Sequence, residues 1–158
     1  MIPLVIDRRN NRSHKADNIH RSLWTASAKT LDEALNVTNE LIRGEIESVA
    51  PRNARIADLG CGVGASLLYL VPRLQESKSA FGLTLSPVQA RLANQFAKQA
   101  NLEKQIIFAE GDFTSVPLAG ESLDAIYSVE AVVHAPEPED FFQEASRLLR
   151  HGGKLVLV

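Results

Sequence analysis

The chain has 158 residues, of which 45% are hydrophobic and 23% are charged, and its formal net charge at pH 7 is −2. A chain of this length can form one domain with a sizeable buried core. The small net charge predicts no bulk attraction to nucleic acid, and the lack of a long apolar run predicts no stable membrane insertion.

Residues 1–28 form a polar amino-terminal segment, a candidate cap on the domain expected at 29–158. Its residues Arg8, Arg9 and Arg12 are more typical of a solvated tail than of a binding arm. The sequence from Thr30 to Glu33 has the form of a capping box, which predicts the start of a helix. This helix should pack against a sheet through an apolar face made of Leu31, Ala34, Leu35, Leu41, Ile42, Ile46 and Val49.

A glycine-rich sequence, Asp58-Leu59-Gly60-Cys61-Gly62-Val63-Gly64, follows directly on the apolar run 54–57. This pattern predicts a strand that ends in a tight turn, where glycines let the backbone approach a ligand closely. Asp58 favours a cofactor that carries positive charge, because a pyrophosphate would meet like charge there. An NAD site stays open as an alternative, since Gly60, Gly62 and Ala65 also fit the pattern G-x-G-x-x-A.

Further strands and helices alternate along the rest of the chain. The helix after the glycine turn should kink or end near Pro72. The strand 79–85 is followed by Ser86 as a helix N-cap and by Pro87 at the first helical position. Strands are also expected at 105–109, 123–128 and 154–158, with helices at 87–100 and 138–150, the second closed by Gly152 and Gly153. This alternation predicts an α/β fold with a doubly wound, mainly parallel sheet.

The glycine turn resembles the first motif of class I S-adenosylmethionine-dependent methyltransferases. The segment Gly82-Leu83-Thr84-Leu85-Ser86-Pro87-Val88-Gln89 is similar to the branch that contains tocopherol and sterol C-methyltransferases and cyclopropane fatty-acid synthases. The resemblance implies a Rossmann-like sheet with strand order 3-2-1-4-5, without the family's usual sixth and seventh strands. The last strand would then have an open edge. We expect a second copy to pair there as a homodimer, residues 1–6 to fold over it, or the sequence to be a fragment.

The resemblance also implies residues that bind S-adenosylmethionine. The glycine turn would hold the methionine end of the cofactor, while Thr84 and Gln89 hold its ribose in place of the usual carboxylate. Asp112 and Phe113 are the candidates for adenine recognition, by hydrogen bonding and ring packing. Trp24 could cover the sulfonium by a cation–π contact, or simply pack beside a helix. The full set of cofactor-binding candidates is Asp58, Gly60, Cys61, Gly62, Gly64, Thr84, Gln89, Asp112, Phe113, Ser128 and Trp24.

Two residues after the fourth predicted strand are candidates for catalysis. His134 could act as a general base, because an unperturbed imidazole titrates near neutrality, or it could orient the loop. Glu130 is the second candidate, with support of the loop as its alternative. The implied reaction is in-line attack of a small-molecule acceptor on the sulfonium methyl, without a metal or a nucleophilic residue. An NAD-dependent oxidoreductase and a non-catalytic cofactor-binding module are the alternative functions.

Cys61 is the only cysteine, so the chain can form no internal disulfide. A reducing, cytoplasmic compartment is therefore expected. A catalytic thiol is conceivable at this position, but packing within the turn is the favoured interpretation.

Overall fold

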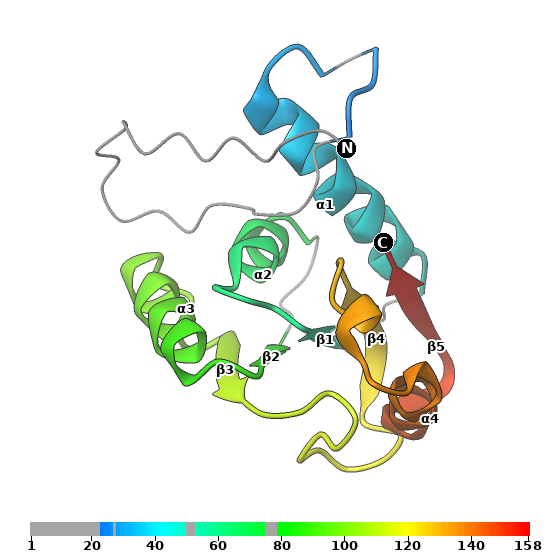
Figure 1. Ribbon diagram of the computed structural model, residues 1–158. Helices are drawn as coiled ribbons and strands as arrows, with labels where there is room; N and C mark the ends of the chain where they lie inside the picture. The colour runs from blue at the N-terminus through cyan, green and yellow to red at the C-terminus, as the bar shows by residue number, and fades with distance from the viewer. Residues whose placement is uncertain (1–22, 27, 50–52, 75–78) are drawn as a thin grey trace.

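A single parallel sheet is the centre of the computed structural model, which describes residues 23–26, 28–49, 53–74 and 79–158. In that part of the chain its strands have the order β3-β2-β1-β4-β5 (Figure 1). This order and the parallel direction confirm the prediction. The strands are β1 (Arg55–Leu59), β2 (Ser79–Thr84), β3 (Ile106–Glu110), β4 (Leu123–Ser128) and β5 (Leu149–Leu157).

Helices cover both faces of the sheet. The helices are α1 (Leu31–Val49), α2 (Ala65–Leu70), α3 (Pro87–Gln99) and α4 (Pro138–Leu148), with 3₁₀ turns η1 (Val71–Arg73) and η2 (Val132–His134). Apolar residues of α1, α2 and α3 share one hydrophobic core with one face of the strands. Apolar residues of α4 share a second core with the opposite face. The two-sided arrangement expected of a doubly wound sheet is therefore present (Figure 1).

The predicted helix starts are confirmed by their capping hydrogen bonds. At α1, Glu33 N–H donates to Thr30 Oγ1 over 3.2 Å, and Thr30 N–H donates to Glu33 Oε2 over 2.9 Å. At α3, Ser86 Oγ accepts from Gln89 N–H, and Pro87 follows as the first helical residue. These contacts satisfy backbone groups that have no partner inside the first turn. They also fix where α3 begins relative to the end of β2.

The buried face of α1 differs from the prediction. Leu31 and Leu41 were expected inside but are 57% and 58% exposed. Leu41 lies one residue away from a buried stripe with four-residue spacing, and Leu31 lies in the first turn. The buried positions of the helix are Ala34, Thr38, Asn39, Ile42 and Ile46.

The prediction for the two glycines before the last strand is wrong. α4 ends at Leu148, and Leu149 is already extended with φ −72° and ψ 132°. Gly152 and Gly153 lie inside β5, whose pairing with β4 has a bulge between Leu123 and Ala125. Gly152 has φ +77° there, so the glycines accommodate the irregular register and do not cap the helix.

Candidate functional site

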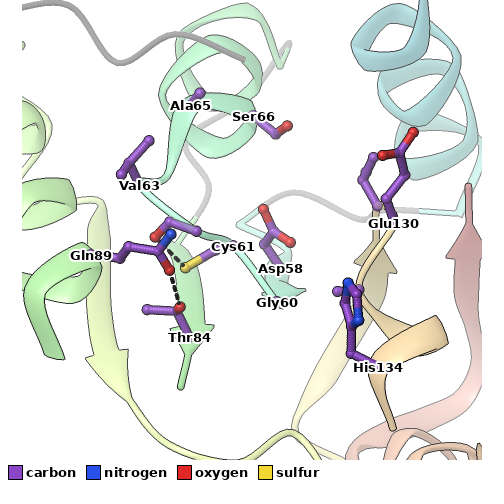
Figure 2. A pocket seen from close by; sticks show the side chains of 13 residues that line it. Asp58, Gly60, Cys61, Val63, Ala65, Ser66, Thr84, Gln89, Glu130 and His134 are labelled. Atoms are coloured by element: carbon purple, nitrogen blue, oxygen red, sulfur yellow. Dashed lines mark hydrogen bonds between the residues drawn. The ribbon is translucent and has the colours of Figure 1, made fainter. Parts of the chain in front are cut away.

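A pocket of about 370 Å³ opens at the carboxyl ends of β1, β2 and β4. β1 lies between β2 and β4, so the strand order reverses at this point. Open α/β sheets bind ligands at such a switch point. The walls are the glycine turn after β1, the junction of β2 with α3, and the segment 129–134 after β4 (Figure 2).

The glycine turn is held between the end of β2 and the segment after β4. The N–H groups of Gly60 and Cys61 donate to Leu83 O over 2.9 and 2.8 Å. Gly60 has φ +103°, and a Cβ there would lie 2.2 Å from Ala131 Cβ. Gly62 has φ +54° but faces open space within the pocket. The turn therefore leaves room for a ligand at Gly62 while Gly60 lies against the segment after β4.

Asp58 is the buried carboxyl of the pocket. Only 3% of the residue is exposed, although it lines the cavity. Burial raises the pKa of Asp58 from 3.8 to about 7, and the neighbouring hydroxyl of Tyr127 partly offsets this rise. A positively charged ligand in the pocket would stabilise the ionised carboxylate. This chemistry fits the ammonium and sulfonium groups that the sequence predicted.

Cys61 lies beneath the turn with its thiol directed at the carbonyl oxygen of Gly62, at 3.6 Å. Burial and then the negative charge of Asp58 raise the pKa of the thiol well above its usual value. Because the thiolate is the nucleophilic form, this environment disfavours thiol catalysis. The packing interpretation of Cys61 is the one that the environment supports.

Thr84 and Gln89 form a hydrogen-bonded pair on one wall of the pocket. Thr84 Oγ1 donates to Gln89 Oε1 over 2.9 Å, as Figure 2 shows. Thr84 closes β2 and Gln89 lies in the first turn of α3, so the Ser86 cap sets their spacing. The pair presents neutral polar groups where a dinucleotide site usually has a carboxylate.

Glu130 and His134 lie on the opposite wall, across the pocket from Thr84 and Gln89 (Figure 2). Glu130 has φ +51°, and its N–H donates to Val158 O over 2.9 Å. His134 ends η2, and its N–H donates to Ala131 O over 3.0 Å. Both residues are exposed, so they border the side of the pocket that solvent reaches.

The family follows from comparison with known proteins. Residues 57–157 match the methyltransferase domain family, and this stretch includes the glycine turn, Thr84, Gln89, Glu130 and His134. The chain belongs to this methyltransferase family. S-adenosylmethionine is its cofactor. The buried carboxyl of Asp58 fits the positive charge of that molecule, and Gly62 leaves room for it.

Named relatives of the methyltransferase act on different acceptors. It is 27% identical over 141 residues to 27-O-demethylrifamycin SV methyltransferase of Amycolatopsis mediterranei, covering 89% of this chain and 50% of that protein. It is 36% identical over 101 residues to sterol 24-C-methyltransferase of Debaryomyces hansenii, covering 64% and 26%. It is 33% identical over 104 residues to chloroplastic tocopherol O-methyltransferase of Arabidopsis thaliana, covering 66% and 29%. The methyltransferase thus spans half or less of these relatives.

Solved structures share its fold. A geranyl diphosphate methyltransferase in complex with GPP and sinefungin has a TM-score of 0.74 and 25% identity, covering 82% of this chain and 46% of that one. The 4+2 cyclase SpnF has a TM-score of 0.79 and 26% identity, covering 90% and 51%. Within its described residues, the methyltransferase has no helix that is both long enough and apolar enough to cross a bilayer.

The methyltransferase pocket includes most of the predicted site residues but not all. Ser128 is buried, and its hydroxyl donates to Leu59 O over 2.6 Å. Asp112 is exposed, and its Oδ1 accepts from the N–H and the hydroxyl of Thr114. Trp24 is 58% exposed. None of these three predicted residues lines the pocket, and neither does Gly64.

Phe113 lies in the hydrophobic core and not on the pocket wall. Its ring meets that of Phe141 edge to face, with centroids 5.3 Å apart. The predicted packing of this ring on adenine has no support from this position, because burial of an aromatic ring against α4 competes with exposure to a ligand.

Residues 1–22 lie outside the described part of the methyltransferase. They include the basic cluster at 8–12, residues 1–6, and the neighbours of Trp24 at 20–22, so the predictions for these segments are not tested.

Five further residues line the pocket that sequence reasoning did not select. Four of them are direct neighbours of predicted residues, and Ser66 lies two positions after Gly64. Ala65 was named only as part of the alternative NAD pattern. Four of the five side chains are apolar and carry no chemical signature of their own, so motif analysis does not detect them. They are Val63, Ala65, Ser66, Val129 and Ala131.

Proposed function

We propose that this domain transfers a methyl group from S-adenosylmethionine to a small-molecule acceptor. The observation that carries the proposal is the arrangement of the pocket, in which Asp58 and the glycine turn lie across from Glu130 and His134. One wall would hold a charged cofactor and the other would meet an acceptor. The names of the relatives support this choice, because rifamycin, sterol and tocopherol derivatives are small molecules.

Three groups of residues would hold the cofactor. When bound, S-adenosylmethionine supplies a methyl group on a positively charged sulfur. We assign the buried Asp58 carboxylate to the ammonium end and the open space at Gly62 to close backbone approach. Thr84 and Gln89 would hydrogen-bond the ribose hydroxyls, with neutral bonds of about 0.5–1.5 kcal/mol each. The exposed Asp112 remains a candidate for the adenine amino group.

The acceptor wall would act mainly by positioning. Alignment of reacting groups can lower a barrier by roughly 7–11 kcal/mol, so no covalent intermediate is needed. The imidazole of His134 borders the pocket and could take a proton from an acceptor hydroxyl or amine. Glu130 would then orient the acceptor or the loop.

The function is tested by calorimetric titration with S-adenosylhomocysteine, with NAD as the control ligand, followed by an acceptor screen with labelled S-adenosylmethionine. The proposal would be supported if the protein binds S-adenosylhomocysteine but not NAD, and if the label passes from S-adenosylmethionine to an acceptor. Binding without transfer to any acceptor would favour a non-methylating role, which the likeness to the cyclase SpnF makes a specific alternative. Binding of NAD alone would overturn the proposal.

His134→Ala should lower turnover by roughly 100-fold if the acceptor must lose a proton, because general-base catalysis typically contributes about 10²–10⁴. Cofactor affinity should stay within about twofold, since His134 lies on the wall across the pocket from Asp58 and Gly60 (Figure 2). Steady-state kinetics and calorimetry on the same preparation separate the two effects. A large loss of cofactor affinity instead would assign His134 a structural role.

We also propose that a second copy pairs with the outer edge of β5. In the described residues β5 pairs only with β4. Val158 directs both its N–H and its carbonyl toward the β4 side, so the backbone groups of Leu157 point outward. Sedimentation should give a dimer, and Leu157→Pro should give a monomer because it removes an outward N–H. A wild-type monomer at micromolar concentration would contradict this pairing.

We also propose a cellular compartment for the protein. The single cysteine is consistent with a reducing environment, and we expect the protein in the cytoplasm. Fractionation of cells that express a tagged chain would test this expectation.

A further inference from the structure

A buried hydroxyl next to the cofactor carboxyl has no hydrogen-bond partner. Tyr127 is fully buried in β4, and its Oη is among the few buried side-chain atoms in the described residues without a partner. A buried polar group without a partner is costly and calls for a reason. Tyr127 and Asp58 are register partners on the adjacent strands β4 and β1. Their side chains therefore leave the same face of the sheet side by side.

Asp58 is the acceptor best placed for this hydroxyl. Burial raises the pKa of Tyr127, and the neighbouring groups that raise it further are Asp58 and, more weakly, Cys61. The Cys61 thiol is already directed at the carbonyl oxygen of Gly62. The carboxyl of Asp58 lines the pocket, and burial favours its neutral form there. Hydrogen bonds to an ionised acceptor are about twice as strong as neutral ones.

We propose that Tyr127 is a positioning residue, whose hydroxyl donates a hydrogen bond to the Asp58 carboxylate when the pocket holds the positively charged cofactor. The bond orients the carboxylate toward the ligand and keeps it ionised. The inference rests on one part of the proposed function, the assignment of Asp58 to cofactor binding, and not on the acceptor. The hydroxyl lies near enough to Asp58 to lower the pKa of that carboxyl, although no hydrogen bond of regular geometry joins the two groups in the free protein.

Tyr127→Phe tests the inference, since it removes the hydroxyl and keeps the ring in the core. We expect S-adenosylhomocysteine to bind roughly tenfold more weakly at neutral pH, as for the loss of a charge-assisted hydrogen bond. We also expect the pH midpoint of binding to move upward. The melting temperature should stay the same or rise, because the variant no longer buries an unsatisfied hydroxyl.

Tyr69→Phe is the matched control. Tyr69 is the other tyrosine of the chain and lies on α2, outside the pocket. Its hydroxyl donates to Oε1 of Glu40 on α1 over 2.8 Å, and the substitution removes this hydroxyl. Cofactor affinity and the pH midpoint should not change in this variant. A general effect of removing a tyrosine hydroxyl would appear in both variants.

Cofactor binding of Asp58→Asn, measured beside that of Tyr127→Phe, shows whether the inference or the cofactor assignment fails. If Asp58→Asn weakens binding and Tyr127→Phe does not, the positioning role is wrong while the cofactor assignment stands. If Tyr127→Phe weakens binding equally at every pH and lowers the melting temperature, the tyrosine only packs, and the inference is overturned. If Asp58→Asn binds as the wild type does, the assignment of Asp58 fails together with the inference.

Discussion

Gly60→Ala should abolish measurable cofactor binding, with a loss of affinity of roughly 100-fold or more, about 3 kcal/mol. The new methyl group would lie 2.2 Å from Ala131 Cβ, far inside van der Waals contact. Either the glycine turn or the segment after β4 must then move, and both line the pocket. Overpacking adds roughly 1–3 kcal/mol of destabilisation, and the positive φ of +103° adds about 1–2 more. Calorimetry and thermal unfolding measure the two effects.

Gly44→Ala is the matched control for this substitution. Gly44 lies inside α1, where a built Cβ would have no atom within 4 Å apart from its chain neighbours and the nearby backbone of the helix, and its φ is not positive. Alanine in the interior of a helix is more stable than glycine by roughly 0.5–1 kcal/mol, so this variant should gain stability and keep cofactor affinity. If Gly60→Ala behaves in the same way, the close contact with Ala131 does not determine the shape of the pocket.

Cofactor affinity should fall as the pH drops through 7. The carboxyl of Asp58 has a pKa of about 7 in the free protein, and a bound cation lowers it by favouring the ionised form. Binding then requires ionisation first, which is about nine-tenths complete at pH 8 and about one-tenth complete at pH 6. S-adenosylhomocysteine should therefore bind about tenfold more weakly at pH 6 than at pH 8. Calorimetry should also show proton release on binding near pH 6.

Asp58→Asn should remove this pH dependence and leave weak binding throughout. The stability of the free protein should depend on pH in the opposite direction to cofactor binding. Because the folded pKa of Asp58 is raised from 3.8 to about 7, stability is lost as the pH rises between these values, by up to about 4 kcal/mol. The variant should thus be more stable than the wild type at pH 8 when no ligand is present. A binding profile of Asp58→Asn that keeps the wild-type slope would contradict this account.

Local signals predicted the parts of the fold that depend on neighbouring residues. Ser86 and Pro87 define a helix start by hydrogen bonding and a fixed φ, and the glycine turn defines a strand end. Gly152 and Gly153 were misread because a helix end and a strand bulge use the same residue, and only the pairing of β5 with β4 distinguishes them. The core position of Phe113 was not visible in the sequence for a similar reason, since its contact with Phe141 joins residues far apart in the chain.

The polar pocket residues were predictable because their side chains carry chemistry. Asp58, Thr84, Gln89 and His134 could be assigned from motif and position, and the structure brings all four to one cavity. Tyr127, the partner of Asp58 on the adjacent strand, could not be found in this way. A tyrosine in an apolar strand has the pattern of a core residue, and only the strand register places it beside a carboxyl.

The close approach of Gly60 and Ala131 would limit how the proposed acceptor specificity can change. Ala131 belongs to the acceptor wall but touches the turn that would hold the cofactor, so a larger side chain at this position would disturb both sites. Val133, two residues further on, is 80% exposed and does not line the pocket. In directed evolution toward new acceptors, position 131 should therefore keep a small residue.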